Sequence, residues 1–182
     1  MLKPVRRIVT GHDGAGRSIV LSDATSPHLL ENPVRPGRGL TDLWRTDRTP
    51  ASNTGSVDAA DRPVTLNPPE QGSVFRFFQI NPAADEAELT EAEREARYAQ
   101  AFTAMGASAD RHDTSRHPGM HQTRTVDYII LLEGEVTLVL DEGEVELRPF
   151  DVVVQRGSNH AWINKGSAPA LLAGVLIDAE PL

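Results

Sequence analysis

The chain contains no cysteine, and this absence removes several kinds of chemistry. Disulfide bonds, thiolate nucleophiles and zinc–thiolate centres all require that residue. Aromatic residues are scarce, at 5% of 182 residues, which argues against a large aromatic-lined groove. Apolar stretches are short: none approaches transmembrane length, and none near the N-terminus suits a signal peptide. We therefore expect a cytoplasmic protein with no membrane partner.

Basic residues are fewer than acidic residues in this chain. Lys and Arg number 18 against 26 Asp and Glu, which gives a formal net charge of -8. A nucleic-acid-binding surface needs a concentrated basic patch, whereas basic residues gather only mildly here, at 3–7 and around Arg35 and Arg38. We therefore expect no nucleic-acid partner. The length and the 39% hydrophobic content suit a single domain over residues 1–182.

The N-terminal part of the chain, residues 1–84, predicts strands and loops. Two β-branched runs, 5–10 and 18–21, flank a turn rich in Gly and Asp, and so predict a β-hairpin. Residues 40–46 predict another strand. Residues 73–80 predict a stronger strand with aromatic side chains on both faces. Such a strand is expected either at the centre of a sheet or at a dimer contact.

One α-helix is predicted within residues 85–106. Thr90 and Glu93 have the capping-box spacing, apolar residues then recur at steps of three and four, and Gly106 is a natural stop. From residue 112 to 178, short strands follow one another with tight turns. This pattern is typical of an antiparallel sandwich or barrel. The fold is therefore expected to be mainly β with one inserted helix.

Two segments within residues 112–178 carry spaced histidines. The first has His121, then Asp127 and Gly134; the second, 157–164, reads Gly-Ser-Asn-His-Ala-Trp-Ile-Asn. Together they resemble the two motifs of the cupin family, His-x-His, three or four residues, Glu, six residues, Gly, and then Pro-x-Gly-x-x-His-x-x-x-Asn. The resemblance covers about a third of the chain. It implies an antiparallel jelly-roll β-barrel, extended by N-terminal strands, with a metal site inside the barrel mouth.

The resemblance also implies which residues would hold the metal. His121 and His160 match the motif histidines, and Asp127 matches the motif glutamate, although it is one methylene shorter. Two imidazoles and a carboxylate suit divalent Fe, Mn, Ni or Zn. Thr123 stands in place of the second motif histidine, and a neutral hydroxyl is a poor ligand. His117 is a further candidate, either as a ligand or as a residue lining the mouth.

Further residues of the two segments are candidates for contact with a substrate. Trp162 shares a strand face with His160 by alternation, so it forms either a pocket wall or ordinary barrel core. Arg124 would orient an anionic group, unless it only forms a surface salt bridge. The candidate substrate-binding residues are Thr123, Arg124, Tyr128, Trp162 and Asn164.

The expected function is that of a metal-dependent small-molecule enzyme, such as a dioxygenase, decarboxylase or isomerase acting on a small polar or acidic metabolite. The metal would act as a Lewis acid or bind dioxygen. The alternative is a non-catalytic barrel that binds a small ligand as a sensor or accessory protein, with His121 and His160 as buried polar core residues. A homodimer is also expected, with a contact along residues 74–80, because a second subunit commonly covers exposed sheet edges.

Overall fold

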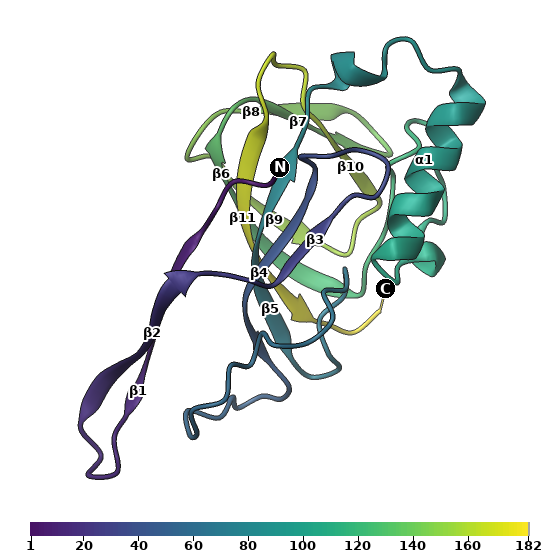
Figure 1. The fold of residues 1–182 in the computed structure, drawn as a ribbon. Helices are drawn as coiled ribbons and strands as arrows, with labels where there is room; N and C mark the ends of the chain where they lie inside the picture. The colour runs from purple at the N-terminus through teal and green to yellow at the C-terminus, as the bar shows by residue number, and fades with distance from the viewer. Residues whose placement is uncertain (182) are drawn as a thin grey trace.

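The computed structural model describes residues 1–181, apart from the side chain of Asp85, and consists mainly of β-strands (Figure 1). Within these residues, six antiparallel strands form the larger sheet, in the order β3-β4-β5-β11-β6-β9. Their bounds are β3 Leu29–Glu31, β4 Gly39–Thr46, β5 Ser73–Ile80, β6 Thr125–Glu133, β9 Val152–Arg156 and β11 Ala170–Asp178. The N-terminal strands β4 and β5 therefore complete a sheet that the C-terminal strands continue. The strand with aromatic residues on both faces, β5, is central, between β4 and β11.

The smaller sheet of the described chain has the order β10-β7-β8, with β7 Val136–Leu140, β8 Glu144–Leu147 and β10 His160–Ile163. Two isolated bridges tie β10 to the larger sheet, one between His121 and His160 and one between Pro82 and Asn164. The segment at His121 thus begins beside β10 and then crosses to the larger sheet as β6. This change of sheet forms a corner between the two layers.

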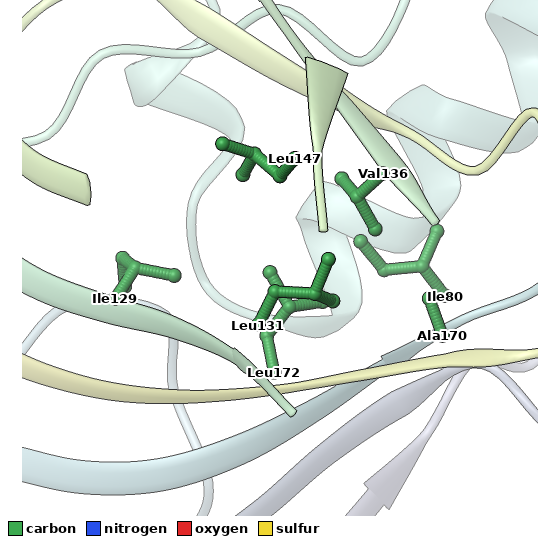
Figure 2. Packing of buried hydrophobic residues seen from close by; sticks show 7 residues of the cluster. All are labelled: Ile80, Ile129, Leu131, Val136, Leu147, Ala170 and Leu172. Atoms are coloured by element: carbon green, nitrogen blue, oxygen red, sulfur yellow. The ribbon is translucent and has the colours of Figure 1, made fainter. Parts of the chain in front are cut away.

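The main hydrophobic core lies between the two sheets (Figure 2). Strands β5, β6 and β11 contribute from one side, and β7 and β8 from the other. The cluster consists of Ile80, Ile129, Leu131, Val136, Leu147, Ala170 and Leu172. Leu131 and Leu172 are fully buried, and each such burial stabilises the fold by about 1.5–3 kcal/mol. This mainly β architecture, with its strands in two facing layers, agrees with the predicted jelly-roll fold.

The predicted helix is confirmed as α1, Glu91–Ala104. The Thr90 hydroxyl accepts a hydrogen bond from the Glu93 amide at 3.2 Å, and the Glu93 carboxylate accepts one from the Thr90 amide at 2.8 Å. These bonds satisfy amides at the helix start that would otherwise have no partner. The 3₁₀ turns η1, Ala83–Glu86, and η2, Ser108–Asp110, lie on either side of the helix. No helix within residues 1–181 is long and apolar enough to span a membrane.

The predicted N-terminal hairpin is also confirmed, as β1 Arg6–His12 and β2 Ser18–Thr25. In the described part of the chain these strands pair only with each other, and Figure 1 shows them projecting away from the two sheets. Ile8 and Val20 are exposed on the hairpin. Nη1 of Arg7 donates to Oδ1 of Asp58 at 2.8 Å, and Asp58 lies in the irregular segment that follows β4. This contact anchors the base of the hairpin.

Candidate functional site

A cavity of about 140 Å³ lies between the larger sheet, β10 and α1. An apolar cavity of about 150 Å³ holds a benzene-sized molecule, so this one has room for a small ring. Its walls are mainly apolar, whereas the polar side chains gather at a few points. Apolar and aromatic residues from several elements line it: Leu40, Phe78, Ile80, Phe102, Ile129 and Trp162.

His121 and His160 lie in contact in the cavity wall, with ring centroids 4.3 Å apart and ring planes tilted by 44°. Their backbones exchange two hydrogen bonds of 2.9 Å. Both rings use Nδ1 in the same way, since Nδ1 of His121 lies 3.0 Å from the Gly119 carbonyl and Nδ1 of His160 lies 2.9 Å from the Ser158 carbonyl. A carbonyl only accepts, so each Nδ1 carries the proton and each Nε2 keeps a free lone pair.

Both imidazoles of this pair are neutral at pH 7. Burial, and after it the neighbouring His121, lowers the pKa of His160 to about 3, against the opposing effect of the Ser158 carbonyl. Burial also lowers the pKa of His121, against the opposing effect of the Gly119 carbonyl. The pair therefore offers the cavity two hydrogen-bond acceptors and no positive charge.

The two histidines belong to a row of rings that runs along the cavity wall from α1 to β5. Ring centroids are 5.0 Å apart for Phe102 and His121, 5.5 Å for His160 and Trp162, and 6.1 Å for Trp162 and Phe78. Trp162 is therefore in the wall that the sequence analysis expected, and it also packs against the main core. The rings are tilted or edge-on to one another, with interplanar angles of 56°, 81° and 57° for these three pairs, so the row forms a continuous ring-lined wall against which a small ligand ring can pack.

Asp127 is the acidic group of the cavity. Its side chain points inward from β6 and is 4% exposed, and among the described residues its Oδ1 has no hydrogen-bond partner. Burial raises the pKa of Asp127 to about 6, while a hydrogen bond from Thr125 and the charge of Arg76 lower it. A carboxyl group with this pKa changes protonation state near neutral pH, as a general acid or base must.

A buried ion pair lies behind Asp127. Arg76 of β5 lines the cavity and is 1% exposed, with Nη2 lying 2.9 Å from Oδ1 of Asp42 on β4. Arg76 also donates to the carbonyls of Thr65 at 2.6 Å and Leu66 at 3.0 Å. These contacts neutralise the guanidinium charge and hold it in place. The sequence analysis did not identify either partner.

The structure does not gather the three predicted metal ligands into one group. Within residues 1–181, no group of three or more His, Cys, Asp or Glu side chains is placed to hold an ion. The aspartate is one methylene shorter than the motif glutamate and therefore reaches less far. Thr123 instead uses its hydroxyl in a 2.7 Å hydrogen bond with Thr125. The residues present thus do not fit a metal of the type that the motifs imply.

The structure places His117, the further candidate, outside the cavity. Its Nδ1 accepts a hydrogen bond from the Gly119 amide at 2.9 Å, so the neutral ring carries its proton on Nε2 and has no lone pair free for a metal. The ring packs edge-on against Tyr98, with centroids 5.3 Å apart, and does not line the cavity. Burial, followed by nearby arginines, lowers the pKa of His117 to about 4.

Three predicted substrate-binding residues lie outside the cavity, whereas Thr123 lines it. Tyr128 is 49% exposed on the outer face of β6, because successive residues of a strand point to opposite faces and its neighbour Asp127 points inward. Arg124 is exposed as well. Asn164 is buried, but its amide donates to the carbonyls of Ile80 at 2.9 Å and Ala168 at 2.7 Å. Its role is therefore to tie the end of β10 to β5.

Sequence reasoning missed the residues at the cavity mouth. Arg38, in the loop before β4, and Arg97 and Tyr98, on α1, all line the cavity. Arg38 donates from Nη1 to the Tyr98 hydroxyl at 3.1 Å, and its guanidinium carbon lies 5.1 Å from the centre of that ring. No sequence motif links these positions to the histidines.

Comparison with known proteins agrees with the fold and the motif positions. The family model of the cupin domain (Cupin_2) matches residues 110–177. The cupin-domain-containing oxidoreductase virC of Hypocrea virens is 43% identical over 191 residues, which cover 100% of this chain and 79% of that protein. Phomopsin biosynthesis cluster protein D of Diaporthe leptostromiformis is 28% identical over 189 residues, which cover 100% of this chain and 82% of the relative.

Among solved structures, a Cupin 2 conserved barrel domain protein from Salinispora arenicola CNS-205 aligns over 82% of each chain, with 15% identity and a TM-score of 0.42. The family assignment rests on the 43% identity to the Hypocrea relative, over 79% of that protein's length. This chain belongs to the cupin family.

Proposed function

We propose that this chain is a cupin enzyme that transforms a small metabolite in the cavity, with Asp127 as the group that takes and returns a proton. The observation that carries this proposal is the buried Asp127 carboxyl, which has an oxygen without a partner among the described residues and a pKa raised to about 6. Titratable groups perturbed in this way, inside a mainly apolar pocket, are typical of catalytic sites. The printed names of the relatives, cupin-domain-containing oxidoreductase and biosynthesis cluster protein, support a role in making small molecules.

The two neutral imidazoles would orient the substrate. Because Nδ1 of each ring is bound to a backbone carbonyl, Nε2 of His121 and of His160 accepts a hydrogen bond from a substrate hydroxyl or amide. The row of rings would hold the apolar part of the substrate and exclude water from it. These contacts fix the reacting atom relative to Asp127, and such positioning contributes a large part of many rate enhancements.

The proton balance favours an isomerisation among the reaction types that the sequence analysis expected. The ionised Asp127 takes a proton from one substrate atom and returns it to another, so the cycle needs no further reactant. A net oxidation, as the names of the relatives suggest for those proteins, would need an electron acceptor such as dioxygen. The reaction type is therefore open to a direct measurement.

The test uses a set of small cyclic carbonyl compounds incubated with the protein in deuterium oxide. Wild-type protein is expected to incorporate deuterium into at least one compound, as measured by mass spectrometry, without oxygen uptake. Asp127→Asn should slow this exchange by about 10²–10⁴-fold, because the amide is isosteric but does not transfer the proton. Asp61→Asn, an exposed site outside the cavity, is the matched control. Unchanged exchange in Asp127→Asn would exclude the proposed role.

Metal dependence is tested separately, by mass spectrometric metal analysis of untagged protein beside His121→Ala and His160→Ala. The incomplete ligand set predicts far less than one equivalent of iron, manganese, nickel or zinc in all three samples. Near-stoichiometric metal that both variants lose would overturn the metal-free mechanism. It would restore the metal-dependent enzyme expected from the motifs.

One observation favours a non-catalytic alternative. Thr123 replaces a motif histidine and is engaged with Thr125, while the row of rings would bind a planar ligand without any chemistry. A protein of this kind would bind a small molecule and release it unchanged. Saturable binding with neither deuterium exchange nor oxygen uptake would decide for this alternative.

A further inference from the structure

The arginines of the cavity fall into two classes. Arg76 is paired with Asp42 at 2.9 Å, and Arg35 is paired with Glu86 at 2.6 Å. Arg38 and Arg97, in contrast, form no salt bridge with any described side chain. Paired guanidinium groups are structural, whereas those without a carboxylate remain available to a ligand.

The acidic groups nearby are already engaged. Glu93 lies one helical turn before Arg97, but its carboxylate accepts hydrogen bonds from the Thr90 amide at 2.8 Å and the Thr90 hydroxyl at 2.7 Å. Glu31 also lines the cavity, and its Oε1 accepts a hydrogen bond from the Gly37 amide at 2.6 Å. These hydrogen bonds hold both carboxylates away from a salt bridge with Arg38 or Arg97, on a chain whose formal net charge is -8.

Four guanidinium groups line the cavity, those of Arg35, Arg38, Arg76 and Arg97, against the three carboxyl groups of Glu31, Glu86 and Asp127. Positive groups therefore outnumber negative ones along its wall. In a cavity with apolar walls, the field of these charges is screened less than at an open surface. An anion entering the cavity would therefore be attracted before it makes any contact.

Arg38 is also held in position for binding. Its Nη1 donates to the Tyr98 hydroxyl at 3.1 Å, and its guanidinium lies over the Tyr98 ring at 5.1 Å. An arginine fixed in this way loses less side-chain entropy when it binds an anion, and its remaining N–H groups match the two oxygens of a carboxylate. Arg97 precedes Tyr98 on α1 and adds a second cation to the same cavity.

We propose that the cavity selects a small carboxylate, whose anionic group lies between Arg38 and Arg97 while its apolar ring packs along the row from Phe102 to Phe78. The proposal rests on the proposed function because it concerns the same cavity, and it adds the class of substrate. The proposal also gives Arg38 and Arg97 the anion-binding role that the sequence analysis gave to Arg124, because Arg124 is exposed and lies outside the cavity.

The test compares benzoate with benzamide, which have nearly the same shape and differ in charge. Binding to the full chain is measured by isothermal titration calorimetry at low ionic strength. Wild-type protein is expected to bind benzoate at least about tenfold more tightly, as two charge-assisted hydrogen bonds imply. Arg97→Gln and Arg38→Gln should each remove most of this preference, because the loss of charge weakens benzoate binding far more than benzamide binding. Arg97→Lys, which keeps the charge, should restore part of it.

Arg124→Gln is the matched control, since it removes an exposed arginine close to the motif and should keep the full preference. Arg97 is partly exposed on the helix, so its substitution is the test to rely on if Arg38→Gln does not fold. Equal affinity for benzoate and benzamide in wild-type protein, or no saturable benzoate binding, would overturn the proposal. Neither result would affect the deuterium-exchange test of Asp127, so the two proposals fail independently.

Discussion

The two faces of the six-stranded sheet differ in the charged and apolar residues that they carry. Beside the main hydrophobic core, its inner face buries the charged groups Asp42, Arg76 and Asp127, which are 0%, 1% and 4% exposed. Its outer face exposes large apolar side chains: Phe75, Tyr128, Ile130, Val152 and Val154. Strand alternation produces both faces at once, because each inward charged residue of β5 and β6 has an apolar neighbour pointing outward.

The contrast separates two functions of one sheet. Burying charge costs free energy unless the charge is paired, so the inner charges point to a site that needs them. A contiguous exposed apolar face commonly marks a surface that another protein covers. The inner face therefore serves the ligand, and the outer face is the better candidate for the predicted homodimer contact. Because β5 is a central strand, only its outward side chains, such as Phe75, are available to that contact.

The largest effect should come from breaking the inner ion pair. Arg76→Met leaves Asp42 buried without its partner, and we expect the free energy of unfolding to fall by about 3–5 kcal/mol. Urea unfolding followed by circular dichroism measures the loss. The double variant Asp42→Leu with Arg76→Met should recover most of it. A loss below about 1 kcal/mol in the single variant would mean that water relieves the charge, contrary to its burial.

A pair of adjacent residues on β6 sharpens the same contrast. Leu131 is fully buried in the core, whereas Ile130 is 38% exposed on the outer face. Leu131→Ala should destabilise the fold by about 2–5 kcal/mol through lost burial and a cavity. Ile130→Ala should change stability by about 0.5 kcal/mol or less in the monomer. Equal losses at high protein concentration would show that a partner covers the outer face.

The buried titratable groups give the inner face a pH dependence. Because the pKa of His117, His121 and His160 is lowered by folding, the unfolded state binds more protons below about pH 6.5. Each histidine therefore reduces the free energy of unfolding by about 1.4 kcal/mol per pH unit as the pH falls toward its folded pKa. Asp127, whose pKa is raised to about 6, has the opposite effect between about pH 6 and 4 and offsets one histidine.

Urea unfolding at a series of pH values from neutral to mildly acid measures this slope. His160→Asn should reduce the slope of the free energy of unfolding against pH by the contribution of one histidine. A slope that is the same in the variant and in wild-type protein would show that His160 is not kept neutral by the fold.

Substitutions on the outer face should have the smallest effect on the stability of the fold. They should instead change whether the protein forms a dimer. Tyr128 and Val154 are 49% and 56% exposed, and they face each other across strands β6 and β9. Tyr128→Glu with Val154→Lys should leave the unfolding of the monomer nearly unchanged. Light scattering should give a dimer mass for wild-type protein and a monomer mass for the variant. A monomeric wild-type protein at micromolar concentration would remove the homodimer prediction.

Local patterns in the sequence were enough to predict α1 and the hairpin, whereas the resemblance to the cupin motifs implied that the two histidines meet. The capping box at Thr90 and the two spaced motifs act over short stretches of chain, and the structure places His121 and His160 in contact. The error at Tyr128 was avoidable, because alternation from the inward Asp127 already predicts an outward side chain.

The remaining parts of the site depend on packing between distant segments. Arg38 and Arg97 come from a loop and a helix that meet only when α1 covers the cavity, so no spacing connects them. Pairing of β4 with β5 is regular from Gly39 to Asp42 and sets Asp42 opposite Arg76. The ion pair between them depends on which strands become neighbours, and no local pattern in the sequence shows that.

The corner at His121 has one more consequence. The amide of His121 donates to the carbonyl of His160 and the amide of His160 donates to the carbonyl of His121, so one opening motion exposes both amides to solvent. A ligand held by the two imidazoles opposes that motion. Its binding free energy should therefore appear as slower hydrogen exchange at both amides, by a common factor. The exchange rates of these two backbone amides therefore report whether a ligand occupies the cavity, even for a ligand that is not yet identified.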